Sequence, residues 1–333
     1  MNVDAYITTS LASSYGSRDE RLWSLYQRGK NAQWNAESDI DWSPEVSFGA
    51  LQSQDAASTA VPYSSLLEGL IPPGRWDSFR WEYQAWMINQ FLHGEQGALV
   101  ATARLVETVP DLSAKSFAAN QVGDEARHVE AYSRYIDEKL GVTYPMNPGL
   151  ETVLRDLLSD SRWDIVYLGM QIIVEGLALA ATRIASTGFG DPVIKSISRM
   201  IARDEARHIS FGILALDGVY SEMTDPELAD REDFLTEAIY QMSQRFLLHE
   251  VWERLEMDVR QAVSFVQSNP SMIAFRMTMF QRVVQALRHL GLLTPRVCAV
   301  LVSEGLARAG TLPGSDPAAS IVAGRTRHPN GRK

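Results

Sequence analysis

The sequence predicts an all-α protein built around a four-helix bundle with one functional centre. The first observation is a repeated five-residue word, Asp-Glu-Ala-Arg-His, at residues 124–128 and 204–208. The second is that Glu95 and Glu175 each precede the glutamate of one word by 30 residues, so the two halves are offset by a constant 80. The third is that no segment alternates apolar and polar residues over more than a few positions, as strands do. Together these observations predict four helices in two related pairs.

The N-terminal segment, residues 1–75, is predicted to contain a single helix. Residues 1–17 are rich in Ser, Thr and Ala and are expected to be loosely held. An amphipathic helix is predicted at 19–30. The stretch 33–44 is aromatic and acidic without a helical period, so we expect its tryptophans to pin it to the bundle. Residues 50–62 are predicted to form a loop.

Residues 76–309 are predicted to form the bundle and its flanking helices. Asp111, Asp191 and Asp225 are candidate N-caps, the last two followed by proline at the first helical position, and Gly141 is a candidate C-cap. The predicted helices cover 77–108, 112–140, 148–158, 163–187, 192–220, 226–257, 271–290 and 294–309. Short turns join the motif helices within each pair, so these are expected to be antiparallel neighbours.

Composition narrows the class of protein. The net charge of −10 argues against nucleic-acid binding. No stretch approaches twenty uncharged apolar residues and the first ten residues do not resemble a signal peptide, so we expect a soluble, cytoplasmic protein with no membrane partner. Cys298 is the single cysteine, which excludes a disulfide framework and a thiolate metal site. The Gly-, Pro- and Ala-rich basic tail at 310–333 is predicted to be disordered.

The repeated word places a glutamate and a histidine three residues apart, on one face of a helix. Together with the two earlier glutamates, the four helices present four carboxylates and two imidazoles to the centre of the bundle. These candidate metal ligands are Glu95, Glu125, His128, Glu175, Glu205 and His208. Mixed oxygen and nitrogen ligation suits iron or manganese better than zinc. We therefore predict a site for two metal ions.

A simpler interpretation is that each Glu-x-x-His pair is an ordinary solvated pair on a helix surface. Both words, however, lie among apolar residues, and so do Glu95 and Glu175. Burying an unpaired charge is costly, and four buried carboxylates repel one another unless cations lie between them. This argument favours the metal site.

Residues next to the ligands are candidates for orienting them. A histidine that binds a metal needs an acceptor for its other ring N–H. Asp124 and Asp204 project toward the opposite motif helix, so crossed pairs are predicted, Asp124 with His208 and Asp204 with His128. Two arginines, Arg127 and Arg207, either pair with these aspartates or lie exposed on the surface, and helical spacing leaves both interpretations open.

The central half of the chain, about residues 76–220, resembles the ferritin-like di-iron carboxylate superfamily, in particular its ribonucleotide-reductase-like oxygen-activating branch. The six-residue ligand pattern carries this resemblance. The segment His93-Gly-Glu95 with its 30-residue step is similar to the catalytic subunit of bacterial multicomponent monooxygenases. The second word, within 203–208, is similar to that of soluble acyl-carrier-protein desaturases, and the entry segment around Trp34 and 39–42 is similar to these oxidases as well.

The chain also departs from each subgroup. Multicomponent hydroxylases have a threonine where this chain has Leu179, and desaturases have a longer step between their first two ligand motifs. The p-aminobenzoate N-oxygenase group has a third histidine where this chain has Ile201. Reductase small subunits usually begin with an aspartate ligand, where this chain has Glu95, and end in a tail tyrosine, whereas the last tyrosine here is Tyr240.

The resemblance implies two Fe ions, or a Mn/Fe pair, with O2 as co-substrate and an external electron donor such as a ferredoxin or a reductase. It implies a di-iron monooxygenase or oxidase that hydroxylates, N-oxygenates or desaturates a small, largely apolar molecule. One alternative is an R2-like radical-generating or ligand-binding dimetal protein that acts for a partner. Iron storage is disfavoured, because ferritins are much shorter. The sequence leaves a homodimer open.

The substrate pocket is predicted from the residues one helical turn away from the ligands. These are Leu99, Gln121, Gln171, Leu179, Ile201 and Gly212. They are mostly apolar, as expected for an apolar substrate. Tyr132, one turn after His128, occupies the position of the radical-forming tyrosine of reductase small subunits. It is an oxidisable phenol, a hydrogen-bond donor in the pocket or a plain core aromatic.

Overall fold

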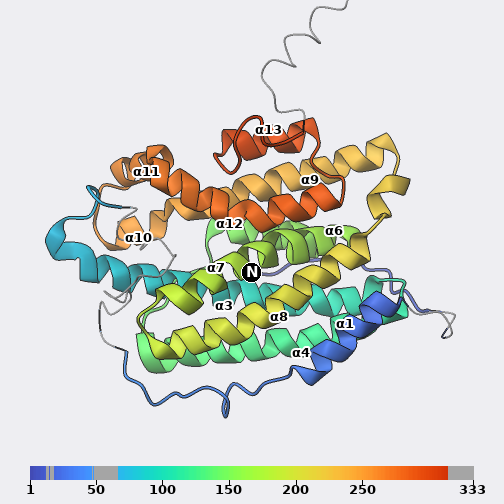
Figure 1. The fold of residues 1–333 in the computed structure, drawn as a ribbon, viewed down its shortest axis with the longest axis horizontal. Helices are drawn as coiled ribbons and strands as arrows, with labels where there is room; N and C mark the ends of the chain where they lie inside the picture. The colour runs from blue at the N-terminus through green and yellow to red at the C-terminus, as the bar shows by residue number, and fades with distance from the viewer. Residues whose placement is uncertain (13–14, 16–18, 47, 49–66, 314–333) are drawn as a thin grey trace, which may run out of the picture.

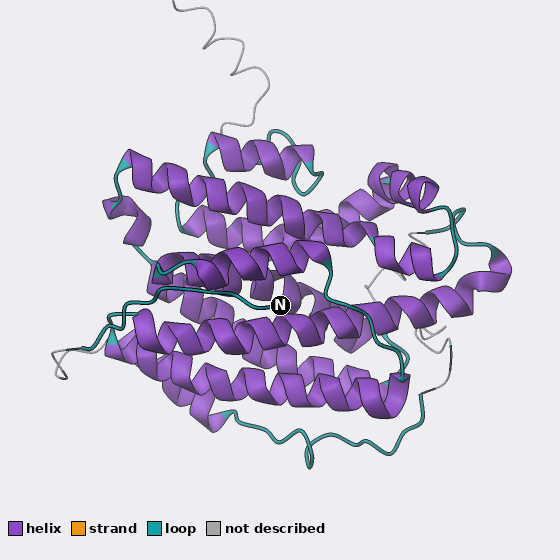
Figure 2. Cartoon of the chain, turned by 180° about the vertical axis from the view of Figure 1, so that it is seen from behind, coloured by secondary structure: helices purple, strands orange, loops and turns teal. Residues whose placement is uncertain are grey.

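In the residues that the computed structural model of the protein describes, all regular secondary structure is helical. The described residues are 1–12, 15, 19–46, 48 and 67–313. A bundle of long helices lies in the lower half of Figure 1, and a second group of helices is stacked above it. Figure 2 shows the same chain from behind, with no strand in the described part. The predicted all-α bundle with flanking helices is confirmed. The predicted loop at 50–62 and most of the predicted tail lie outside the described residues.

The bundle consists of α3 (Trp76–Thr108), α4 (Leu112–Tyr135), α7 (Glu175–Gly188) and α8 (Pro192–Leu216). Each of the pairs α3–α4 and α7–α8 is joined by a short connection and packs along its length, so its members are antiparallel. Contacts between α4 and α8 bring the two repeated words together.

Aspartate caps fix where the two motif helices begin. The Asp111 side chain accepts a hydrogen bond from Ala114 N at 2.7 Å, and Asp191 accepts one from Val193 N at 2.8 Å. A cap of this kind satisfies a backbone N–H that has no partner within the helix. Both N-caps were predicted. Beyond α4 the chain makes one π-helical segment, η2 (Ile136–Leu140), and ends at Gly141 with a φ of 62°, as the predicted C-cap requires.

The helix predicted at 163–187 contains a π-helical segment that its sequence did not reveal. It divides into α6 (Trp163–Tyr167), η3 (Leu168–Val174) and α7. A π segment changes the rotation of the residues that follow it, and such segments recur at functional sites. Here the residue that follows is Glu175, so η3 sets the direction in which this carboxylate enters the bundle.

A glycine allows α8 to approach this π segment closely. A Cβ at Gly212 would lie 2.6 Å from the Cβ of Gln171. No side chain fits in that distance, so Gly212 keeps the two helices in contact.

The second group of helices covers the α3 and α7 side of the bundle. It contains α5 (Pro148–Ser159), α9 (Asp225–Gln244), α10 (His249–Arg254), α11 (Val259–Ser268), α12 (Pro270–His289) and α13 (Pro295–Ser303). We call this second group of helices the cover. Within it α9 packs on α5, while α12 packs on α7 and α10 packs on α3 of the bundle. Short 3-10 turns η1 (Pro73–Arg75), η4 (Val219–Glu222) and η5 (Arg245–Leu247) lie between the longer helices.

The cover differs from the prediction in several places. The single helix predicted at 226–257 is broken, because η5 and Leu248, whose φ is 56°, separate α9 from α10. The N-cap of α9 is Thr224 in a capping box with Glu227, so the prediction of Asp225 was wrong by one residue. Helix α11 was missed, and α8 and α13 end earlier than predicted.

The helical stretch Trp163–Gly188 is long and apolar enough to cross a membrane by length and composition, although Asp164, Glu175 and Arg183 interrupt it. In the structure, 83% of its most apolar window is buried inside the protein. Its apolar residues therefore form the centre of the fold.

The N-terminal segment packs against the bundle. Helix α1 (Glu20–Asn31) begins at the N-cap Asp19, as predicted, and contacts α4 and α8. The tryptophans of the following stretch are anchored by hydrogen bonds, Trp34 Nε1 to Asp204 at 2.7 Å and Trp42 Nε1 to the Ala36 carbonyl at 2.8 Å. The prediction that tryptophans pin this segment is confirmed.

Candidate metal centre

All six predicted ligands are buried, and they meet at the centre of the bundle. One glutamate comes from α3 and one from the start of α7, while α4 and α8 each supply a glutamate and a histidine. The exposed fraction of these residues ranges from 0% to 6%. Four carboxylates and two imidazoles thus lie together beyond the reach of bulk water.

The ligand atoms form two overlapping groups, each the size of a metal site. Atoms of Glu95, Glu125, His128 and Glu205 lie within 4.8 Å of one another, and so do atoms of Glu125, Glu175 and His208. Glu125 belongs to both groups. Its two oxygens face the two histidines, 3.3 Å from His128 Nδ1 and 3.2 Å from His208 Nδ1. This geometry is that of a carboxylate placed to bridge two cations.

Glu205 also lies between the two groups. Its Oε1 is 3.6 Å from His128 Nδ1 and 3.8 Å from His208 Nδ1. Neither of its carboxylate oxygens has a hydrogen-bond partner among the described residues. A buried carboxylate without donors is strongly destabilising unless a cation is present.

The donor set as a whole fits two divalent cations. One oxygen each of Glu125 and Glu175, and Nδ1 of His208, likewise lack a hydrogen-bond partner among the described residues. The other oxygens of Glu125 and Glu175 accept from Gln121 Nε2, at 2.8 Å and 2.9 Å, and Glu95 Oε2 lies 3.1 Å from His128 Nδ1. The unused lone pairs all face the interior of the cluster, where metal ions would accept them.

The predicted crossed pairs are present. His128 Nε2 lies 3.1 Å from Asp204 Oδ2, and His208 Nε2 lies 3.2 Å from Asp124 Oδ2. An ionised aspartate accepts from each Nε2–H, so Nδ1 of each ring is the atom left to bind a metal. In the metal-free chain Nδ1 faces the glutamates instead, and His128 Nδ1 lies 3.1 Å from Glu95 Oε2. The aspartates therefore fix the tautomer that metal binding requires.

Both arginines of the repeated word pair with these aspartates. Arg127 hydrogen-bonds Asp124, and Arg207 hydrogen-bonds Asp204, each one turn earlier on its own helix. Each guanidinium also lies within 4 Å of the other aspartate, at 3.9 Å and 3.8 Å. The four glutamates and two aspartates carry six negative charges, the arginines offset two, and two divalent cations would neutralise the remaining four.

Two contacts from the N-terminal segment complete the outer layer of the site. Trp34 Nε1 donates to the same Asp204 oxygen that faces His128, and the Trp34 and His128 rings are stacked with centroids 6.2 Å apart. Gln33 Nε2 donates to Asp124 Oδ1 at 2.8 Å. Sequence reasoning identified Trp34 only as an anchor, because nothing in the local sequence indicates a partner 170 residues away.

The crowded carboxylates hold protons when no metal is bound. Burial raises the pKa of Glu95 to about 7 and that of Glu175 to about 8, and raises the pKa of Glu205 well above its ordinary value. Burial opposes the charge on His208, but the neighbouring carboxylates outweigh it and raise the pKa of His208 to about 9. Near neutral pH the metal-free site therefore retains several protons.

Metal uptake should consequently release protons. Metals and protons compete for the same lone pairs, so raising the pH through the range 7 to 9 favours binding and lowering it opposes binding. We expect the metal affinity to rise about tenfold or more per pH unit, as it does when at least one proton is displaced. Titrations with Mn2+ at several pH values, with a pH indicator to count released protons, measure this directly. An affinity independent of pH would contradict the proton-loaded site.

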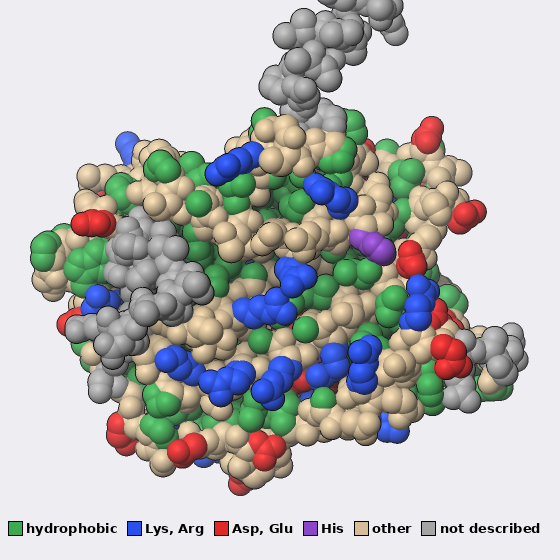
Figure 3. All heavy atoms as spheres, viewed as in Figure 1, with side chains coloured by type: hydrophobic (Ala, Val, Ile, Leu, Met, Phe, Trp, Pro, Cys, Tyr) green, Lys and Arg blue, Asp and Glu red, His purple; other side chains and the backbone are tan. Residues whose placement is uncertain are grey.

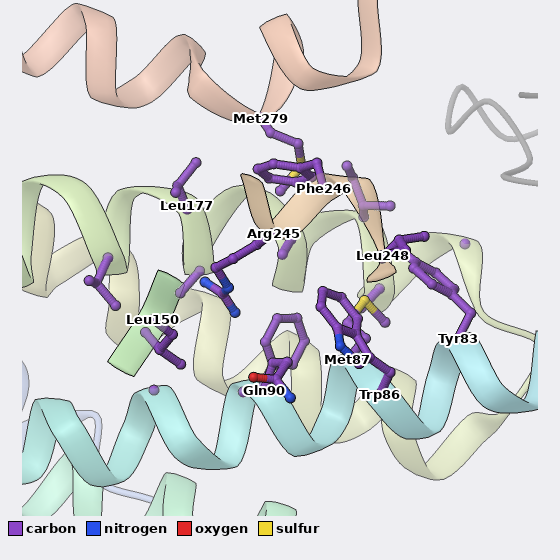
Figure 4. Close-up of a pocket in the computed structure, with 18 of the residues that line it drawn as sticks. Tyr83, Trp86, Met87, Gln90, Leu150, Leu177, Arg245, Phe246, Leu248 and Met279 are labelled. Carbon is purple, nitrogen blue, oxygen red and sulfur yellow. The ribbon is translucent and has the colours of Figure 1, made fainter. Parts of the chain in front are cut away.

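An elongated, mostly apolar cavity of about 150 Å³ opens beside the cluster. It follows α3 from Phe79 to Ala98 and the neighbouring face of α7, and the cover closes it from above. Figure 4 shows side chains from these elements pointing into it. Glu95, Glu175 and Glu205 lie in its wall, so the candidate metal site borders this cavity.

The predicted pocket residues do not line this cavity. Leu99, Gln121, Gln171, Leu179, Ile201, Gly212 and Tyr132 are all absent from its wall. All but Leu99 are buried within the bundle, because one turn from a ligand leads to packing between the four helices as well as toward open space. The cavity lies instead between the bundle and the cover, and the sequence does not indicate which side of the bundle the cover occupies.

Two of these residues remain close to the site in other roles. Gln121 holds two of the glutamates through its amide, as described above. Tyr132 is fully buried, packs against Phe91 with ring centroids 5.5 Å apart, and its hydroxyl has no hydrogen-bond partner among the described residues. Burial, then the charges of Glu95 and Glu205, raise the pKa of the Tyr132 phenol well above its ordinary value.

No protein-family model matches the chain, and no curated protein does. Among solved structures, an R2-like ligand-binding oxidase variant with an anaerobically reconstituted Mn/Fe cofactor matches with a TM-score of 0.48 and 17% identity, covering 80% of this chain and 92% of its own. A second variant with the same cofactor description has a TM-score of 0.47 and 17% identity, with coverages of 84% and 96%. Because the similarity is this low, the metals and the reaction must be inferred from the residues of this chain.

Proposed function

We propose that the chain is an O2-activating dimetal oxidoreductase that oxidises a small, largely apolar organic molecule. The observation that carries this proposal is a buried set of four carboxylates and two imidazoles, with lone pairs facing inward, on the wall of an apolar cavity. A purely structural metal site needs no such cavity, whereas oxidation of an organic molecule requires a dry space beside the metals.

The ligand chemistry favours iron. Carboxylate-rich sites with one imidazole per metal suit Fe and Mn, so we propose two Fe ions and keep a Mn/Fe pair as the variant. When bound, such metals would pass electrons from an external donor to O2, so that O2 can act as the oxidant of the substrate. The chain itself contributes the ligands, the aspartates that hold the histidines, and apolar walls that exclude water.

We propose that electrons come from outside the chain and enter through the N-terminal segment. Trp34, Asp204 and His128 form a hydrogen-bonded line from the N-terminal segment to a ligand of the cluster. The only exposed charges on α8 are basic, with Arg199 and Arg203 one turn apart and without ion pairs among the described residues. Figure 3 shows a row of basic side chains across the face on which α8 lies. We propose that an acidic electron donor, such as a ferredoxin, docks there.

Charge reversal tests this docking. The double variant Arg199→Glu and Arg203→Glu should slow reduction of the metals by an acidic ferredoxin about tenfold at low salt, since surface charges govern association rates. Stopped-flow absorbance follows the reduction. Reversing two exposed arginines of the cover, Arg260 and Arg288, is the matched control and should have little effect. Equal rates for the two double variants would exclude α8 as the docking surface.

The decisive experiment for the function is metal analysis followed by turnover. Protein reconstituted with Fe2+ should bind two metals per chain, consume O2 in the presence of a reductant, and oxidise members of a panel of small apolar acids, amines and aromatics, as mass spectrometry would detect. Two bound metals without any reductant-dependent product would refute the oxygenase.

One specific observation favours a second candidate, an R2-like radical-generating protein acting for a partner. This observation is the buried Tyr132 phenol near Glu95 and Glu205.

Replacing Tyr132 by Phe separates these two candidates. The hydroxyl makes no hydrogen bond among the described residues, so its loss should leave metal content and oxygenase activity within about twofold of the parent chain. A tyrosyl-radical signal in electron paramagnetic resonance after O2 exposure, absent from the variant, would support the radical protein. Loss of product formation with both metals still bound would make the phenol a participant in the oxygenase.

A further inference from the structure

The cavity beside the metal centre contains one cation deep in its wall. Its lining is mostly apolar, and its polar atoms come from the three glutamates of the cluster, Gln90, Tyr83, Trp86, Arg80 and Arg245. Arg80 is paired with Asp77 at 3.0 Å on α3. Arg245 comes from the opposite side, at the break between α9 and α10, and Figure 4 shows it reaching down between Leu150 and Leu177 toward Gln90.

Arg245 is half-buried with its Nε fully enclosed, and it lacks the partners that an enclosed guanidinium normally has. None of its nitrogens lies within 4.0 Å of a carboxylate oxygen among the described residues, and Nε is buried without a hydrogen-bond partner. Its one hydrogen bond is a contact of 3.7 Å from Nη1 to the Met242 sulfur, a weak acceptor. Burial lowers the pKa of Arg245 to about 10, with Glu250 acting in the opposite direction, so the side chain is charged at neutral pH.

Other buried arginines of the chain show what a structural guanidinium looks like here. Arg231 makes two hydrogen bonds to Asp164, at 2.9 and 3.0 Å. Arg276 donates to the carbonyl oxygens of Val266 and Gln267. Arg245 is the exception, and leaving a buried charge unpaired costs stability.

The neighbouring polar group is already satisfied. Gln90 Nε2 donates to the Pro145 carbonyl and Gln90 Oε1 accepts from Asn147 N, both at 2.8 Å. Unlike Gln90, therefore, Arg245 lines the cavity without donating to any oxygen acceptor among the described residues, and its one hydrogen bond is the weak contact with the Met242 sulfur.

We propose that Arg245 binds the carboxylate of the substrate, so that the pocket takes a small monoanionic acid with an apolar body. The inference rests on the proposed function, because bound metals are what neutralise the three glutamates that would otherwise repel an anion. A guanidinium presents a planar fork of N–H donors that matches a carboxylate. The negative charge of a bound carboxylate gives the Arg245 guanidinium an ion-pair partner, which no described residue provides.

A carboxylate fits the site better than a phosphate. A phosphate monoester carries a charge of about −1.5 to −2 at neutral pH and is usually held by several donors. Away from the three glutamates of the cluster, Arg245 is the one lining cation without an ion pair among the described residues, so it balances a single negative charge.

The size of the ligand is also limited. A cavity of about 150 Å³ is the size that takes up benzene in other proteins. Gln90 precedes Glu95 by five residues, about 7.5 Å along the helix axis, so an acid held at Arg245 places one ring or a short chain beside the cluster. Benzoate is therefore the first probe, and benzamide is its uncharged counterpart of nearly the same shape.

The test is a binding measurement on protein loaded with Mn2+ and kept free of O2, with titration calorimetry of benzoate, benzamide and phenyl phosphate. We expect benzoate to bind more tightly than benzamide. Arg245→Met should weaken benzoate binding about 10- to 100-fold and leave benzamide unchanged, since a hydrogen-bonded charge contact is lost. Arg245→Lys keeps the charge, so its affinity for benzoate should lie between that of the parent chain and that of Arg245→Met. Arg282→Met is the matched control, because Arg282 is exposed on α12 outside the cavity wall, and it should bind benzoate like the parent chain.

Stability provides a second readout. Because Arg245 is an unpaired cation, Arg245→Met should have a Tm equal to or above that of the parent chain, whereas a structural arginine would lower the Tm on removal. The proposal is overturned if benzoate and benzamide bind equally well, or if benzoate binding does not depend on Arg245. If phenyl phosphate binds more tightly than benzoate and its binding depends on Arg245, the choice of a carboxylate is wrong. If two Mn2+ ions bind but benzoate does not, this inference alone fails; if no metal binds, the proposed function fails.

Discussion

Replacing Glu125 by Ala is expected to abolish the binding of both metals. Glu125 is the one side chain that belongs to both groups of ligand atoms, with an oxygen 3.3 Å or less from Nδ1 of each histidine. Its loss removes a ligand from each metal at once and leaves Gln121 Nε2 without one of its two acceptors. We expect the metal content to fall from two per chain to near zero, corresponding to a loss of affinity of about 100-fold or more.

Elemental analysis after reconstitution and desalting measures this result. Glu130→Ala is the matched control, because Glu130 lies on the same helix but is exposed to solvent. His208→Ala removes a ligand from the group formed by Glu125, Glu175 and His208, so the metal of this group should be lost. Two metals per chain in either ligand variant would show that the assignment of the ligands is wrong.

Removing the metals should destabilise the whole fold. The metal-free centre buries four carboxylates, of which three have a pKa raised by burial, in the middle of all four bundle helices. A ligand present at about 1,000 times its dissociation constant stabilises the native state by about 4 kcal/mol per site. Two sites together should therefore raise the Tm by on the order of 10 °C in this chain.

Thermal unfolding with and without a chelator measures this shift. Glu205→Gln provides a sharper test, because Glu205 is expected to hold its proton in the metal-free chain. Without metals, the Tm of the variant should therefore be close to that of the parent chain. With metals, the Tm of the variant should be well below that of the parent chain. The Glu125→Ala chain, which we expect to bind no metals, should not respond to the chelator. A Tm that is the same for the metal-loaded and metal-depleted parent chain would argue against a metal site that joins the four helices.

The internal repeat allowed much of the centre to be predicted. Periodicity places Glu125 and His128 on one face of a helix, and the constant offset of 80 relates them to Glu205 and His208. The crossed contacts of Asp124 and Asp204 with the histidines followed from the same helical geometry, because the aspartates precede the ligand glutamates and face the neighbouring helix. These arguments needed only local backbone geometry and the cost of burying charge.

The pocket could not be predicted in this way. Residues one turn from a ligand, such as Ile201 and Leu179, satisfy the same periodicity as true pocket residues, yet they fill the space between helices. The cavity exists because the cover leaves space above α3 and α7, and its cation, Arg245, lies 40 residues after Glu205 at a helix break that no local signal marked.

The sequence by itself therefore determined the all-α class, the four motif helices and the six candidate ligands, because helical period and the cost of buried charge are properties of local sequence. Only the tertiary structure decided the π-helical turn before Glu175, the contact of Trp34 with Asp204 and the position of Arg245 over the cavity. Each of these depends on how elements distant in the chain pack against one another, and that packing overrides local preference.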